Sequence, residues 1–167
     1  MADVQETETT FKGITFLDLF PILRDPLAFE TLITHILHHI TSQTIPKLES
    51  KKIDTVVGLD ARGFLLGPIV ALRLGAAFVP VRKKGKLPGK CTTVTYEKEY
   101  GAASALISIQ FTTDVLDTTG GSAKAAGELV AKQGGKTVEY LFVVGLPFLK
   151  GHEKLDAPAY SIIEADD

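Results

Sequence analysis

The chain has 167 residues, of which 45% are hydrophobic and 23% are charged, a balance typical of a globular protein with one sizeable core. Its net charge of −2 and isoelectric point of about 6.1 argue against a bulk attraction to nucleic acid or to an anionic membrane. A single cysteine, Cys91, rules out a disulfide within the chain, and no run approaches the roughly 18 apolar residues of a membrane span, so we expect a cytoplasmic protein.

The first part of the chain predicts a polar tail, an apolar lead-in and one helix. Residues 1–12 begin with the acidic run MADVQETETT, which has no signal-peptide pattern and predicts a disordered tail. Asp25 and Pro26 stand where a helix N-cap and a first helical residue are expected. The helix predicted over residues 24–43 has one apolar stripe, made of Leu32, Ile33, Ile36, Leu37 and Ile40.

Histidines on this helix are the first candidate ligands. His35 and His39 are one helical turn apart, a spacing that two ligands of one metal ion can have. No carboxylate or cysteine joins them in the pattern, so we interpret them, with His38, mostly as part of a solvated helix face rather than a metal site.

The remaining chain alternates predicted strands and helices. Residues 53–59 predict a strand, Asp60 to Gly63 a tight turn, residues 64–74 a helix ended by Gly75, and residues 76–82 a second strand. The further predicted elements are a hairpin or two loop-linked strands over 92–101 and 105–111, a helix over 121–132, and strands over 136–146 and 158–165. This order indicates a single α/β domain over residues 13–167, with a central, mostly parallel, twisted sheet flanked by helices.

Two basic features fall where predicted strands end, which is where ligands bind in open parallel sheets. The turn Asp60–Arg62 lacks the glycine pattern of a dinucleotide site, so it is either an arginine-bearing part of another site or an exposed loop with a solvated ion pair. The next strand runs into VRKKGKLPGK, whose cations suit a polyanion such as pyrophosphate unless the loop is simply solvated.

Two later segments add candidate chemistry. Glu97 and Glu99 in TYEKEYG are carboxylates that could act as general acid or base, although exposed strand carboxylates are commoner. The run TTGGS opens a predicted helix, whose backbone N–H groups bind phosphate well, the alternative being an ordinary helix start. The basic loop, the arginine-bearing turn and this phosphate cradle all lie at carboxyl ends of strands, and together they indicate a phosphate-handling site.

Over residues 13–163 the chain resembles the adenine branch of the type I phosphoribosyltransferases. The resemblance is carried by VVGLDARGF, FVPVRKKGKLPG, YEKEYG, TTGGSAKAAGELV and FLKGHEKL, and RKKGKLPG followed by EYG is specific for the adenine branch. It implies the family's sheet with a small amino-terminal hood. It also implies purine salvage by a homodimer that transfers ribose 5-phosphate from phosphoribosyl pyrophosphate (PRPP) to N9 of adenine, giving AMP and pyrophosphate with Mg²⁺ as cofactor, and no nucleic-acid or membrane partner.

The resemblance further implies roles for individual residues. Phe16 resembles the residue that stacks on adenine, Glu99 the carboxylate that acts on the purine, and Tyr100 its partner in the same loop. Arg62 lies in the region that serves the base and the pyrophosphate, and we count it with Glu99 and Tyr100 as catalytic. The positions that resemble phosphate ligands are Arg82, Lys83 and Lys86 for the pyrophosphate, and Thr118, Thr119, Gly120, Gly121 and Ser122 for the 5′-phosphate.

One segment departs from the family pattern. Asp114 fits the first of two acids that face the ribose diol, but Val115 replaces the second acid. We expect Asp114 to contact the metal ion mainly through PRPP. After Gln110 the chain is about ten residues shorter than the pattern, which at about 3.3 Å per residue is a turn and most of a strand. The lead-in before Ile14 is shortened too. The sequence therefore leaves open a salvage enzyme, an impaired paralog that binds nucleotide or pairs with an active subunit, and a phosphate-binding module of another α/β family.

Overall fold

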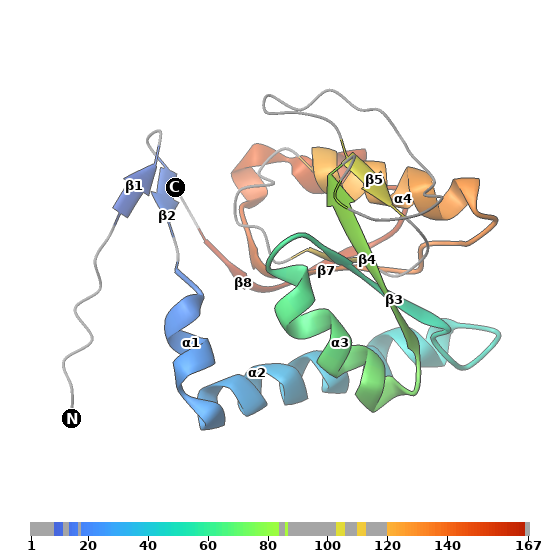
Figure 1. Cartoon of the computed structure of the whole chain (residues 1–167), viewed down its shortest axis with the longest axis horizontal. Helices are drawn as coiled ribbons and strands as arrows, with labels where there is room; N and C mark the ends of the chain where they lie inside the picture. Colours follow the sequence, from blue (N-terminus) through green and yellow to red (C-terminus); the bar gives the residue numbers. More distant parts are fainter. Residues whose placement is uncertain are drawn as a thin grey trace.

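The computed structural model describes residues 9–11, 14–16, 18–83, 86, 103–105, 110–112 and 120–165. Figure 1 shows a twisted sheet between two layers of helices, with a short hairpin at the amino-terminal end. The strands are β1 Thr9–Phe11, β2 Ile14–Phe16, β3 Thr55–Leu59, β4 Ala77–Lys83, β5 Ala103–Ala105, β6 Gln110–Thr112, β7 Tyr140–Gly145 and β8 Ala159–Glu164. The α-helices are α1 Phe20–Arg24, α2 Pro26–His39, α3 Gly63–Leu74 and α4 Gly121–Lys132; a π-helical turn covers Ile40–Thr44, and 3₁₀ turns cover Ile45–Lys47, Pro147–Leu149 and Gly151–Lys154.

The main sheet has the strand order β5-β4-β3-β6-β7-β8. The neighbours from β4 to β8 are parallel, and β5 runs antiparallel along β4 at one edge. This arrangement confirms the α/β fold class predicted from the alternating elements. Because β3, β4, β6 and β7 are parallel, their carboxyl ends meet at one edge of the sheet, and the loops that follow them can share a site.

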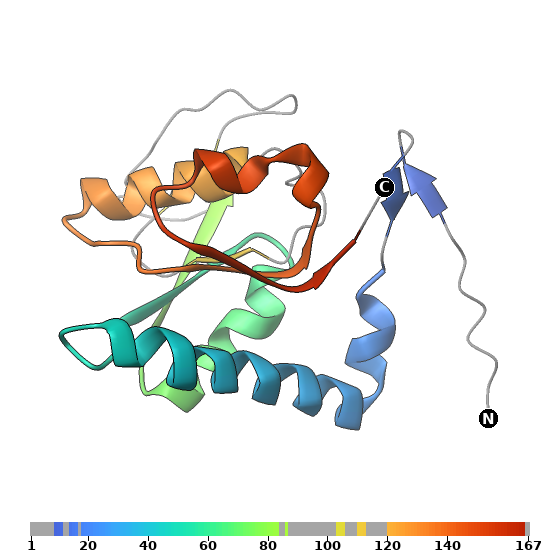
Figure 2. The ribbon, with the colours of Figure 1, turned by 180° about the vertical axis from the view of Figure 1, so that it is seen from behind.

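Helices cover the sheet on both faces, α2 and α3 on one and α4 on the other (Figures 1 and 2). Successive residues of β3 point to opposite faces, as the pleat of a strand requires. Val56 therefore joins the core under α2 and α3, whereas Val57 packs with Leu129 and Val130 of α4. Burial on both faces accounts for the continuous apolar run of this strand.

Helix α2 begins as its sequence predicts. The Asp25 carboxylate accepts hydrogen bonds from the backbone N–H groups of Leu27 and Ala28, at 2.9 and 3.2 Å, and Pro26 occupies the first helical position. Such a cap contributes about 0.5–2 kcal/mol to stability. The predicted apolar stripe faces the core, with Ile33, Ile36 and Ile40 buried.

The prediction of a solvated histidine face is wrong for His39. Its Nε2 lies 2.9 Å from Oε1 of Glu139, its ring stacks on Tyr160 with centroids 3.6 Å apart, and its side chain is only 14% exposed. His35 is exposed, but its Nε2 lies 2.9 Å from the Tyr160 hydroxyl. These partners come from the segment before β7 and from β8, so helical spacing could not reveal them. Within the described residues no cluster of three or more possible metal ligands occurs.

The strand expected over residues 105–111 is also corrected. Residues 103–105 form β5 beside β4, whereas residues 110–112 form β6 between β3 and β7. The two ends of the expected strand thus belong to different strands on opposite sides of the β3–β4 pair, and residues 92–101 lie outside the described part.

Of the predicted tail, residues 9–11 form β1. None of the helices in the described ranges is long and apolar enough to cross a lipid bilayer.

Candidate functional site

The turn after β3 is held tightly against the edge of the sheet. The backbone N–H of Asp60 donates to the carbonyl oxygen of Val81 in β4 at 2.9 Å, so the start of the turn is tied to the neighbouring strand. Helix α3 starts three residues later, and a Cβ on Gly58 would lie 2.6 Å from the carbonyl oxygen of Gly63. The absence of a side chain at Gly58 therefore lets the first turn of α3 pack directly on β3, which places Arg62 at the carboxyl edge.

Arg82 lies next to this turn, near the end of β4. Its Nε donates to Oδ2 of Asp60 at 3.0 Å, and its guanidinium carbon lies 5.9 Å from the centre of the Phe64 ring. Its Nη1 donates to the backbone carbonyl of Lys86 at 3.4 Å. Arg82, the first cation of the basic segment, therefore lies next to the arginine-bearing turn, and Asp60 of this turn forms an ion pair with it.

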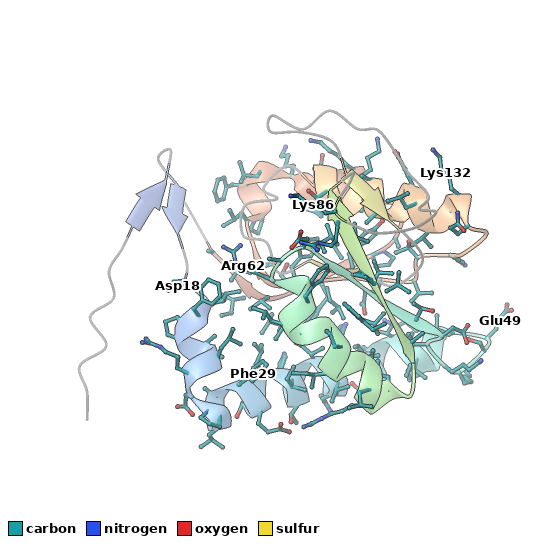
Figure 3. All side chains as sticks on the ribbon, in the orientation of Figure 1. Asp18, Phe29, Glu49, Arg62, Lys86 and Lys132 are labelled. Atoms are coloured by element: carbon teal, nitrogen blue, oxygen red, sulfur yellow. The ribbon has the colours of Figure 1, made fainter. Side chains whose placement is uncertain are left out.

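Arg62 faces the amino-terminal part of the chain. It precedes α3 and lines a small apolar hollow between α1, α2 and α3, together with Leu19, Phe20, Leu23, Leu32, Leu65 and Leu66. Figure 3 shows Arg62 at the start of α3 and Lys86 beyond the end of β4, with Glu49 and Phe29 on more distant parts of the molecule. Arg62 therefore connects the edge that carries Arg82 with the segment that follows the hairpin.

The amino end of α4 lies at the same edge and is the second predicted anion-binding feature. Gly120 precedes the helix with φ of 70°, and its carbonyl accepts from the N–H of Lys124 at 2.9 Å. A Cβ on Gly120 would collide with the carbonyl oxygen of Gly151, so only glycine fits both the conformation and the space. Gly121 starts the helix as predicted and Ser122 is buried. The positive end of the helix dipole and its first N–H groups face this edge and favour a phosphate.

A cavity of about 330 Å³ adjoins Gly120. Its walls come from the carboxyl half of β7, from β8 and from the turns between them; the lining residues are Phe142, Val144, Gly145, Leu146, Pro147, Gly151, His152, Ala157, Pro158, Ala159, Ser161 and Glu164. A volume above about 300 Å³ is within the range of small-ligand pockets. These walls were not predicted from the sequence; Pro147 and Gly151, which mark turns after a strand, are the only signals that local patterns offer for them.

Other predicted site residues are not described by the structure. Glu99, Tyr100 and Asp114 lie outside the described residues, as do Thr118 and Thr119. Phe16 ends strand β2 and Lys83 ends strand β4, but only their backbone is described. Their roles therefore stay predictions.

Comparisons with known proteins decide the family. No family model matches the chain. The adenine phosphoribosyltransferase of Yarrowia lipolytica is 46% identical over 166 residues, covering 93% of this chain and 88% of the relative. The chain belongs to the adenine phosphoribosyltransferase family. Adenine phosphoribosyltransferase 1 of Saccharomyces cerevisiae is 48% identical over 92% of this chain and 84% of its own length.

Solved adenine phosphoribosyltransferases share the fold. The Saccharomyces cerevisiae enzyme, in complex with an imino-altritol bisphosphate and adenine, superposes with a TM-score of 0.80 at 45% identity, over 90% of this chain and 88% of that chain. The Trypanosoma brucei enzyme, in complex with AMP, pyrophosphate and ribose-5-phosphate, gives 0.75 at 25% identity, over 90% and 70%. These findings confirm the type I phosphoribosyltransferase fold and identify the chain as a pentosyltransferase of purine salvage that acts on adenine.

Proposed function

We propose that the carboxyl edge of the sheet binds PRPP, and that the chain transfers its ribose 5-phosphate to N9 of adenine, giving AMP and pyrophosphate. The observation that carries the proposal is the placement of two anion-binding features at one edge. Arg82 lies beside the arginine-bearing turn on one side, and the amino end of α4 follows β6 on the other. PRPP is a molecule with a phosphate at each end of a ribose, so it requires two such features.

The basic side of the edge is the proposed pyrophosphate site. Pyrophosphate gains negative charge as its bond to C1′ breaks, so cations held there stabilise the transition state. The guanidinium of Arg82 can donate two parallel hydrogen bonds to one phosphate, whereas an ammonium such as that of Lys86 acts as a point charge. Arg62 and Lys83, from the turn and from the end of β4, complete the proposed set of cations.

The amino end of α4 is the proposed site of the 5′-phosphate. Backbone N–H groups at the start of a helix donate to phosphate oxygens, and the helix dipole favours the negative charge. Gly120 and Gly121 keep side chains away from the approaching phosphate, and Ser122, Thr118 and Thr119 offer hydroxyls. This role needs only backbone groups and hydroxyls, so it does not depend on the altered acids further upstream.

Adenine is proposed to lie between the hood and the loop that carries Glu99. Phe16 stacks on the purine ring. The Glu99 carboxylate removes a proton from N7, with Tyr100 beside it, and the N9 lone pair then attacks C1′. The N9–C1′ bond forms as the C1′–oxygen bond to pyrophosphate breaks, through a transition state with oxocarbenium character.

Mg²⁺ is the proposed cofactor. It is usually bound through one or two carboxylates plus substrate phosphates, and Asp114 offers an oxygen ligand of that kind. When bound, the ion neutralises charge on the leaving pyrophosphate. We also propose a cytoplasmic homodimer, on the strength of the family resemblance.

A coupled assay for AMP formed from adenine and PRPP with Mg²⁺ tests the proposal. We expect adenine to be used at least about tenfold better than hypoxanthine, because a site that pairs with a base's polar groups discriminates strongly against analogues that leave them unpaired. Equal use of the two bases would contradict the assignment of the base.

Alanine variants test the phosphate ends separately. Arg82→Ala or Lys86→Ala should weaken pyrophosphate and PRPP binding by about tenfold or more, the effect of losing a charge-assisted hydrogen bond, and should affect AMP less. Lys132→Ala is the matched control, since Lys132 ends α4 about 17 Å from the first residue of that helix. Equal losses for pyrophosphate and AMP would show that the basic side acts on folding instead.

A second candidate is a nucleotide-binding relative that does not turn over PRPP. Val115, where the family has a second acid, favours it, because the ribose diol would lose one of its two acceptors. In that case AMP binds while the assay stays at background. Val115→Asp should then raise turnover more than it raises phosphate affinity.

A further inference from the structure

Arg82 projects toward α3 rather than into the core under α4. Side chains alternate along β4, and Val81 is buried in the core under α4. Phe78 is on the opposite face, where its ring packs against Gly58 and Gly67 and leaves no room for a Cβ at either glycine. Arg82 shares the face of Phe78, because the two are four residues apart on a strand. This position brings its guanidinium to the start of α3.

Three groups from three segments converge on that guanidinium. The Asp60 carboxylate accepts from Nε at 3.0 Å, the Phe64 ring centre is 5.9 Å from the guanidinium carbon, and the Lys86 carbonyl accepts from Nη1 at 3.4 Å. The Asp60 carboxylate and the Phe64 ring are themselves fixed in place by contacts with β4. Asp60 is tied to β4 through its backbone N–H, and the Phe64 ring meets that of Phe78 edge-on, with centroids 6.1 Å apart and planes at 88°.

We infer that Asp60 and Phe64 are positioning residues that orient the Arg82 guanidinium toward the pyrophosphate of PRPP. The inference rests on the role given to Arg82 under the proposed function. A free arginine side chain has many rotamers, and a ligand that must immobilise it binds less tightly than one that finds it already oriented. A guanidinium has five N–H donors, so the two hydrogen bonds described here still leave three for a phosphate.

Folding stability gives a weaker account of these contacts. The side chains of Arg82 and Asp60 are 37% and 27% exposed, and ion pairs this exposed contribute little to stability. A carboxylate beside a pyrophosphate site would also repel the ligand unless its charge were offset, which the contact with Arg82 achieves. Positioning and charge can be separated, because Asp60→Asn keeps a side-chain acceptor but removes the charge.

Calorimetric titration with pyrophosphate and with AMP, in the presence of Mg²⁺, tests the inference after urea unfolding has shown that each variant folds. Asp60→Ala should lower pyrophosphate affinity about tenfold, as expected when an oriented side chain regains its rotamers, and Phe64→Leu about threefold. Asp60→Asn should stay within about twofold of wild type, and AMP affinity should stay unchanged in all three, because AMP has no pyrophosphate.

Glu30→Ala is the matched control. Glu30 pairs with Arg73 through two hydrogen bonds of 2.6 and 2.7 Å on the outer surface of α2 and α3, so its loss removes an ion pair without touching the site. Glu30→Ala should change neither the affinity for pyrophosphate nor the affinity for AMP. The decisive variant is Asp60→Ala combined with Arg82→Ala, in which the effect of Asp60→Ala should vanish if Asp60 acts through Arg82.

Three outcomes would overturn the inference. If Arg82→Ala weakens pyrophosphate binding but Asp60→Ala does not, or if Asp60→Ala has the same effect with and without Arg82, then Asp60 does not position Arg82 and the proposed function still stands. If Arg82→Ala itself leaves pyrophosphate binding unchanged, the proposed role of Arg82 fails, and the positioning role fails with it.

Discussion

Replacing Gly120 by alanine tests how closely the phosphate-binding end of α4 depends on its neighbour. Gly120 has a left-handed conformation, and a Cβ there would collide with the carbonyl oxygen of Gly151. A left-handed alanine costs about 1–2 kcal/mol, and forcing a methyl group into a packed contact costs about 1–3 kcal/mol more. We therefore expect the free energy of unfolding to fall by about 2–5 kcal/mol, which lowers Tm by about 10 °C for a chain of this size.

Gly134 provides the matched control. It is also left-handed, with φ of 75°, but no atom in the described part of the chain lies within 4 Å of the position a Cβ would take. Gly134→Ala therefore carries the backbone cost alone, about 1–2 kcal/mol, and Tm should fall by only about 3–6 °C.

Thermal unfolding followed by circular dichroism measures both changes, and calorimetry measures AMP binding. Gly120→Ala should also weaken AMP binding, because relief of the collision moves the amino end of α4, whereas Gly134→Ala should not. Equal losses of Tm in the two variants, with unchanged AMP binding, would refute the reasoning.

Three further changes probe catalysis, the core and the surface. Glu99→Gln should lower kcat about 100-fold or more with little change in KM for PRPP, and unchanged turnover would remove Glu99 from the mechanism. Tyr140→Phe removes the hydrogen bond of 2.5 Å from the Tyr140 hydroxyl to Asp156. Burial, and then this bond, raise the pKa of the Tyr140 phenol. The free energy of unfolding, measured with urea, should therefore fall by about 1–3 kcal/mol in this variant. The hydrogen bond from Arg73 lowers the pKa of Glu30 from 4.5, so the stabilisation is present above pH 4.5 and is lost as the pH falls through the lower folded value. Because the pair is exposed, Glu30→Gln should lower the urea midpoint only slightly at pH 7 and not at all at pH 2, and an equal decrease at both would contradict the pairing.

Features that depend on neighbours within a few residues could be predicted from the sequence. Helix α4 spans Gly121–Lys132 as expected, α3 ends at a left-handed Gly75, and Asp25 caps α2. Each of these rests on local backbone geometry, because a cap, a stop or an apolar stripe acts within about one or two helical turns. The parallel β3–α3–β4 unit followed from the order of the elements.

Contacts between distant segments could not be predicted. The strand expected over 105–111 is divided between β5 and β6, since a short apolar run does not specify which strand it pairs with. His39 was expected to be solvated, yet it pairs with Glu139, 100 residues away. The cavity beside Gly120 is formed by β7, β8 and the turns between them. Local patterns mark only the turns, at Pro147 and Gly151, and not which strands enclose the cavity.

The candidate site shows the same division. Composition and motifs determined which chemistry is present: a basic loop, an arginine-bearing turn and a glycine-rich helix start, each at the end of a predicted strand. Only the tertiary structure decided that Asp60 would pair with Arg82, 22 residues away, above the ring of Phe64. The physical reason is that residue type and local spacing determine what a side chain can bind, whereas strand order and register determine which side chains meet at the edge of the sheet.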